Sequence, residues 1–332
     1  IGATIGATSS ERALAGRDEA EARGRAYVLL AELLARGPTA ELMGPASASP
    51  ALAAAIAGRE LDELAADHQH VFGFSVPPLE GLFLDADAGA GGESAARVRE
   101  TYAAIGYRVD PTQDEPEHLA TELRALAVLS GAEADALEDD KRVVVAELRR
   151  LQARLLDAHL LRWLPIFSAA ARRVGRPFPS ALVRQIEQLV RMHRDALGDA
   201  DAREPGPALG ETLDLDDPEL DLRDIARFLT TPARAGVFLG RGDIARVGRA
   251  FRLPRGFGGR ALMMQHLLRA AARFDTLAEL TAALVAIVDE SDAQLRSWGA
   301  CADPWRARAS ATREALARLG RAASLPDREV PG

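Results

Sequence analysis

The chain has 332 residues, of which 27% are charged and 48% hydrophobic, with a net charge of -8 and a pI of about 5.4. This composition is typical of a globular protein long enough for two domains. The acidic balance argues against nucleic-acid binding, which needs a basic surface, and permits a basic partner such as an arginine-bearing peptide.

The sequence has few features that would indicate disulfide bonds, metal binding through cysteines, a membrane span or secretion. Cys301 is the single cysteine, so an internal disulfide framework and a cysteine cage for a metal are excluded. No stretch reaches the ~20 apolar residues of a membrane span. Residues 1–17 carry no signal-peptide pattern and predict a disordered or cloning-derived tail. We therefore expect a soluble, cytoplasmic protein.

Apolar residues recur at helical spacing along most of the chain, and strand-like alternation is rare. Before residue 198 this pattern predicts helices at residues 18–36, 61–72, 93–105, 115–130, 141–170 and 180–197. The helix at 141–170 contains Pro165, which lacks the amide proton that a helix interior needs. We expect that helix to kink or break at the proline.

Residues 198–220 interrupt the helical pattern with Gly, Pro and a run of acidic residues. They predict a linker between a domain at residues 18–197 and a C-terminal helical unit at residues 221–332. Helix starts are indicated by Thr231-Pro232, and Thr276 with Glu279 has the spacing of a capping box. Further helices are expected at residues 244–251, 260–274, 277–298 and 303–320. The predicted fold is all-α: a multi-helix bundle followed by a smaller helical unit.

Two segments concentrate polar side chains near expected helix starts. One is residues 114–119, Asp-Glu-Pro-Glu-His-Leu, and the other is residues 77–80, Pro-Pro-Leu-Glu. His118 and Glu122 are four residues apart and so share one helix face. A histidine beside acids at a helix end suits binding of a basic or hydrogen-bonding ligand better than it suits a reaction.

Recognised catalytic and metal-binding patterns are missing from the sequence, which has no Gly-x-Ser-x-Gly elbow and no His-Glu-x-x-His helix. We expect no catalytic residue, no cofactor and no native metal. His159 and Trp163 follow the apolar stripe of the long helix, where they are either core residues or the floor of an apolar groove. Glu80 is either a partner for a helix start or an acid in that groove.

Three segments, in order, resemble the TorD/DmsD (NarJ-like) family of molybdoenzyme maturation chaperones. Residues 68–84, HQHVFGFSVPPLEGLFL, are similar to its Pro-Pro-Tyr-Glu region. Residues 115–119 resemble its Glu-Pro-x-Asp-His-Leu motif, and residues 159–167 resemble its His-x-x-x-Trp-x-Pro-x-Phe stretch. The resemblance covers roughly residues 18–197. Leu79 replaces the family's tyrosine and Glu117 its aspartate, and residues after 220 lie outside the shorter members.

The resemblance implies an all-helical, cytoplasmic chaperone without enzymatic activity. Its partner would be the catalytic subunit of a molybdenum-cofactor oxidoreductase of the dimethyl-sulfoxide-reductase type, bound through its twin-arginine signal peptide or as the apo form. Neither nucleic acid nor a membrane span is expected, and a homodimer is left open. The resemblance and the neighbouring residues together predict a peptide-binding site of Leu79, Glu80, Phe83, Glu115, Pro116, Glu117, His118, Glu122, His159 and Trp163.

Two other hypotheses are also consistent with the sequence. One is an enzyme, such as a nucleotide hydrolase, that uses the face shared by His118 and Glu122. The other is a scaffold subunit that stays bound to a redox complex. An enzyme needs a small polar pocket with convergent ionisable groups, whereas a chaperone needs an apolar groove flanked by acids.

Overall fold

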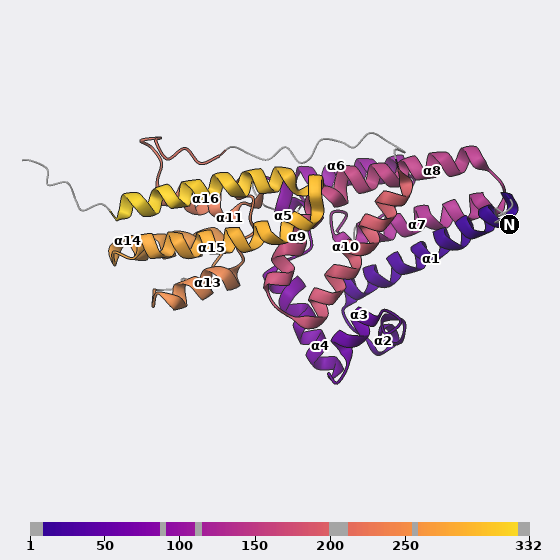
Figure 1. Ribbon diagram of the computed structural model, residues 1–332, viewed down its shortest axis with the longest axis horizontal. Coiled ribbons are helices and arrows are strands. Elements are labelled where there is room, and N and C mark those ends of the chain that lie inside the picture. The colour runs from indigo at the N-terminus through magenta and orange to yellow at the C-terminus, as the bar shows by residue number, and fades with distance from the viewer. Residues whose placement is uncertain (1–8, 87–90, 110–114, 199–211, 254–257, 325–332) are drawn as a thin grey trace, which may run out of the picture.

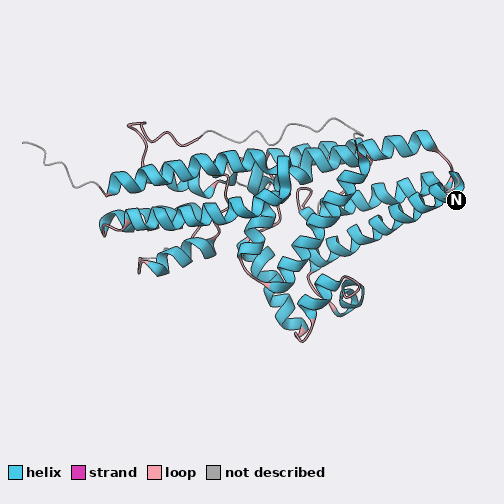
Figure 2. Ribbon diagram, in the orientation of Figure 1, coloured by secondary structure: helices cyan, strands magenta, loops and turns pink. Residues whose placement is uncertain are grey.

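The computed structural model describes residues 9–86, 91–109, 115–198, 212–253 and 258–324. Helices make up most of these residues, and the described part of the chain contains no β-strand (Figure 2). An isolated antiparallel bridge joins Leu79 to His118. The prediction of an all-α fold is confirmed.

The helices before residue 198 form the larger part of the molecule. They are α1 (Ser9–Arg36), α2 (Ala40–Ala46), α3 (Pro50–Ile56), α4 (Leu61–His68), α5 (Glu80–Leu84), α6 (Glu93–Ala104), α7 (Leu119–Glu138), α8 (Arg142–Leu155), α9 (Leu161–Arg173) and α10 (Pro177–Leu197). Helices α1 and α7 run side by side (Figure 1), and the Arg124–Glu32 ion pair at 2.9 Å links them. Leu33 and Leu126 lie in the core that these helices enclose. Burial of such apolar faces, rather than helix propensity, stabilises the bundle.

The break in the long helix lies earlier than the proline. Helix α8 ends at Leu155, a π-helical turn follows at Leu156–Leu160, and α9 then contains Pro165. Helix α9 follows the π-helical turn directly, with the Leu161 amide bonded to the carbonyl of Leu156, and Pro165 is the fifth residue of α9. A π-helical turn holds one extra residue and bends the helix just before the proline. The proline is therefore tolerated, and the chain is interrupted at the π-helical turn that carries His159.

The C-terminal helices are α11 (Leu222–Thr230), α12 (Pro232–Ala235), α13 (Arg241–Ala250), α14 (Arg260–Arg273), α15 (Leu277–Leu295) and α16 (Asp303–Ala323). The capping box lies at the start of α11, where the Asp221 carboxylate accepts from the amide of Asp224 at 2.9 Å. The box predicted at Thr276 and Glu279 is wrong, because the Thr276 hydroxyl turns back to the carbonyl of Ala271.

The C-terminal helices pack directly on α5 and α9. The Trp305 indole N–H donates to the carbonyl of Arg162 at 2.8 Å, and Arg173 pairs with Asp243 at 3.0 Å. Phe238 packs on Phe83 with ring centroids 5.3 Å apart. A second apolar core is built entirely from residues after 220. The predicted units thus share one contact surface, while the exact domain division stays a prediction.

Parts of two predicted segments lie outside the described residues. Residues 1–8 of the predicted tail and residues 199–211 of the predicted linker belong to this group. Residues 9–17, assigned to the tail from sequence, are the first turns of α1. Residues 212–221 contain no helix.

Candidate functional site

The two polar segments singled out in the sequence meet in space. The Glu80 amide donates to the carbonyl of Glu117 at 3.0 Å, and the Leu119 amide donates to the carbonyl of Pro78 at 2.9 Å. These two hydrogen bonds form the Leu79–His118 bridge and place the start of α5 beside the start of α7. A spacing of about forty residues in sequence therefore becomes direct backbone contact.

Glu117 fastens this junction from inside. Its side chain is buried, and its two carboxylate oxygens accept hydrogen bonds from the amides of Gly81 and Gly91 at 3.0 and 2.5 Å. Burial raises the pKa of Glu117, and the two amide donors oppose that rise. Because both oxygens are engaged by backbone, Glu117 holds the loop before α6 against α5 instead of facing a ligand.

Glu80 and His159 form a buried polar pair beneath the junction. Glu80 is 0% exposed, and its Oε2 lies 3.0 Å from His159 Nδ1. The other ring nitrogen of His159 lies 2.8 Å from the Thr101 hydroxyl on α6. Arg97 approaches Glu80 only to 3.9 Å. The pair links α5, α6 and the π-helical turn before α9, so its role in this structure is to join three elements.

Glu122 lies next to Glu80 in the same buried cluster and is also 0% exposed. Burial, followed by the charge of Glu80, raises the pKa of Glu122 well above its ordinary value, and the nearby Trp163 indole acts in the opposite direction. Two adjacent carboxyl groups out of water favour a proton on one of them. Glu122 is the group on which we place that proton.

Trp163 and Phe83 are core residues. Both are 0% exposed, and their rings stack with centroids 5.5 Å apart. The alternative in which they form the floor of an open groove is not what the structure shows, because Phe167 and Phe238 also pack against Phe83. Five residues of the predicted site are thus buried away from any peptide in this structure: Glu80, Phe83, Glu122, His159 and Trp163.

His118 is the N-cap of α7, and its Nδ1 accepts from the amide of Ala120 at 3.1 Å. Helix α7 consequently begins at Leu119 rather than at Glu115 as predicted, and Pro116 lies before the helix. The face shared by His118 and Glu122 is not an accessible one, because Glu122 is buried against Trp163 and Glu80. The structure therefore gives no support to a catalytic pair of His118 and Glu122.

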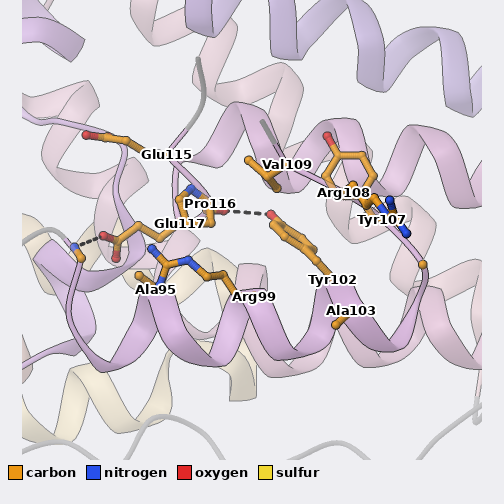
Figure 3. A pocket seen from close by; sticks show the side chains of 12 residues that line it. Ala95, Arg99, Tyr102, Ala103, Tyr107, Arg108, Val109, Glu115, Pro116 and Glu117 are labelled. Atoms are coloured by element: carbon orange, nitrogen blue, oxygen red, sulfur yellow. Dashed lines mark hydrogen bonds between the residues drawn. The ribbon is translucent and has the colours of Figure 1, made fainter. Parts of the chain in front are cut away.

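A cavity of about 900 Å³ opens directly beside this junction. One wall is the motif segment Glu115–Glu117, and the other is α6 with the segment that follows it (Figure 3). The Tyr102 hydroxyl donates to the carbonyl of Pro116 at 3.0 Å and so ties the two walls together. Tyr107 packs edge-on against the Tyr102 ring with centroids 5.1 Å apart. The lining is Gly91, Ala95, Arg99, Tyr102, Ala103, Gly106, Tyr107, Arg108, Val109, Glu115, Pro116 and Glu117.

Reasoning from sequence missed the α6 wall of this cavity. Residues 93–105 were predicted as a helix, but nothing in their pattern shows that Arg99 and Tyr102 face the Glu-Pro-Glu motif. The spacing of Tyr102 and Tyr107 was the one available signal, and it is weak because aromatic residues near a helix end are more often core. Of the predicted site residues, Glu115, Pro116 and Glu117 line the cavity, and Leu79 and His118 lie in the bridge next to it.

Residues 41–169 match the family model described as nitrate reductase delta subunit. The match covers less than half of the chain. The family is one of molybdoenzyme maturation chaperones rather than of enzymes, and it falls in the TorD/DmsD/NarJ group that the sequence motifs indicated. The match contains the Leu79–His118 bridge, the buried acids and the whole lining of the cavity. No curated protein and no solved structure gives a significant match.

No group of three or more His, Cys, Asp or Glu side chains is placed to hold a metal ion in the part of the chain that the structure describes. None of the helices within those ranges is both long and apolar enough to cross a membrane.

Proposed function

We propose that this protein is a cytoplasmic chaperone for a molybdenum-cofactor oxidoreductase of the dimethyl-sulfoxide-reductase type. It binds the twin-arginine signal peptide or the apo form of the catalytic subunit and assists cofactor insertion before export. The observation that carries the proposal is the position of the cavity: the Glu-Pro-Glu motif of the matched family segment is one of its walls. Sequence motif and accessible concave surface thus coincide.

The cavity lining has the chemistry that a peptide needs. Glu115 is exposed at the rim and supplies a carboxylate for a guanidinium group, a pairing that can be bidentate. Arg99 and Arg108 supply donors for the carbonyl oxygens of a peptide backbone, and Tyr102 and Tyr107 supply apolar surface. Burial of apolar side chains gives most of the affinity, and the charged groups set the orientation.

The proposed site is tested by calorimetric titration with a twin-arginine signal peptide and its Lys-Lys counterpart. We expect saturable binding that is weaker for the Lys-Lys peptide, because an ammonium group cannot make the bidentate contact. Glu115→Gln is expected to weaken binding of the twin-arginine peptide by about 1–2 kcal/mol, since a neutral amide replaces the carboxylate. Glu117 is unsuitable for this test because its carboxylate holds backbone in place.

Glu100→Gln is the matched control, since Glu100 is an exposed residue of α6 outside the cavity lining. It should leave the affinity unchanged. Equal affinities for Glu115→Gln and the unaltered protein would show that the peptide binds elsewhere.

Whether the protein releases its partner distinguishes the chaperone hypothesis from the scaffold hypothesis. A chaperone leaves its client after maturation, whereas a scaffold subunit remains in the finished complex. A homodimer, which the sequence left open, would be detected in the same preparations by light scattering.

A further inference from the structure

Part of the C-terminal unit is positively charged, whereas the chain as a whole is negatively charged. Residues 241–274 contain eight arginines and one acidic residue, Asp243, in a chain whose net charge is -8. Most of this segment is α13 and α14, which lie at the end of the molecule away from α1, α7 and α8 (Figure 1). A local excess of one sign against an opposite background indicates a surface that attracts charged partners.

Most arginines of α13 and α14 are exposed and form no ion pair among the described residues, whereas Arg260 is partly buried over the Phe238 ring. Arg241, Arg249, Arg252 and Arg269 are exposed, and none of them forms an ion pair with any residue that the structure describes. Arg246 shares Asp243 with Arg173. Most arginines before residue 198, by contrast, are in ion pairs, such as Arg194 with Asp157 at 2.8 Å. Most of the positive charge of α13 and α14 is therefore not neutralised by ion pairs with the residues that the structure describes.

Apolar side chains are exposed on α14, the helix that carries Arg269 and Arg273, and directly after its end. Leu262 is 44% exposed near the start of α14, and Phe274 is 57% exposed just after its end. The guanidinium group of Arg273 lies 5.8 Å from the centroid of the Phe274 ring. Leu262 and Arg269 are seven residues apart and so share one face of the helix. The acids nearest in sequence are Asp275 and Glu279, both exposed, and they only partly offset the positive charge.

We propose that the face formed by α13 and α14 binds the surface of an anionic lipid membrane. Arginine guanidinium groups bind lipid phosphates, and exposed Leu and Phe side chains enter the headgroup region. Nucleic acid would use the arginines but leave Leu262 and Phe274 in water. An acidic protein would need these apolar residues gathered into one buried centre, whereas they stand at opposite ends of α14. The proposal is independent of the peptide cavity.

The test is co-sedimentation of the full chain with vesicles of phosphatidylcholine, with or without phosphatidylglycerol. Binding is expected only to vesicles that contain the anionic lipid, and it should weaken between about 50 mM and about 500 mM salt because salt screens exposed charges. Arg249→Glu with Arg269→Glu is expected to weaken it at least about tenfold. Phe274→Ser should weaken it less, and the remaining binding should be more sensitive to salt.

The matched control is Arg154→Glu with Arg184→Glu, which reverses the charge of two exposed arginines on α8 and α10, outside the C-terminal unit. This control should bind the anionic vesicles as the unaltered protein does, and circular dichroism confirms that both double variants are folded. No binding to anionic vesicles at low salt would overturn the proposal, as would equal losses in the two double variants. Retention on immobilised poly-glutamate without vesicle binding would also overturn it and assign the face to an acidic protein.

Discussion

Replacing His159 with Ala is expected to lower the free energy of unfolding by about 3–5 kcal/mol. The substitution removes the 3.0 Å partner of a fully buried carboxylate and the 2.8 Å partner of the Thr101 hydroxyl. Arg97, at 3.9 Å from Glu80, does not replace the lost hydrogen bond. Urea unfolding at neutral pH, followed by circular dichroism, measures the change.

Two further variants separate the possible causes of that loss. His159→Leu refills the space but leaves Glu80 without its partner, so we expect it to be nearly as destabilising as His159→Ala. His70→Ala removes an exposed imidazole and should change the free energy of unfolding by less than about 0.5 kcal/mol. If His159→Leu restored full stability, packing alone would account for His159, and the buried pair would contribute little.

Glu122→Gln is expected to stabilise the protein at alkaline pH, by about 1–3 kcal/mol near pH 8. The pKa of Glu122 is raised well above its ordinary value of 4.5 by burial and by Glu80. A carboxyl group with a raised pKa binds its proton more tightly in the folded state. Its contribution to stability is complete below pH 4.5 and is lost as the pH rises through the folded-state pKa. Glutamine mimics the protonated form and carries no such dependence.

The measurement is the difference in free energy of unfolding between Glu122→Gln and the unaltered protein at pH 5 and pH 8. The difference should grow in favour of the variant as the pH rises. Glu138→Gln, an exposed residue of the same helix, controls for removal of one negative charge from α7. A difference that does not change with pH would contradict the assignment of the buried proton to Glu122.

The helices were predictable because helical periodicity is a local property of the sequence. Helices α6, α10 and α14 lie within three residues of their predicted limits. The errors occur where tertiary contacts decide the outcome. The π-helical turn at Leu156–Leu160 brings His159 to Glu80, and Thr276 turns to the carbonyl of Ala271 instead of capping α15.

The candidate site was predicted only in part for the same reason. Sequence spacing showed that Glu80 and Glu117 belong to motifs, but whether a carboxylate is buried depends on segments far away in the chain. The Gly91 amide donates a hydrogen bond to Glu117, and His159 of the π-helical turn pairs with Glu80. The two glutamates of the motif therefore have different roles, which the sequence alone does not distinguish. Glu117 holds the junction together, whereas Glu115 lies exposed at the edge of the cavity.

The most direct test of the proposed chaperone function is the molybdenum content of the catalytic subunit of a dimethyl-sulfoxide-reductase-type enzyme. The subunit is purified from cells that contain this chain, lack it, or carry Glu115→Gln in its place, and molybdenum is measured per subunit. The proposal predicts low molybdenum content without the chain, full content with it, and an intermediate value for Glu115→Gln. Equal content with and without the chain, at equal amounts of subunit, would contradict a role in cofactor insertion.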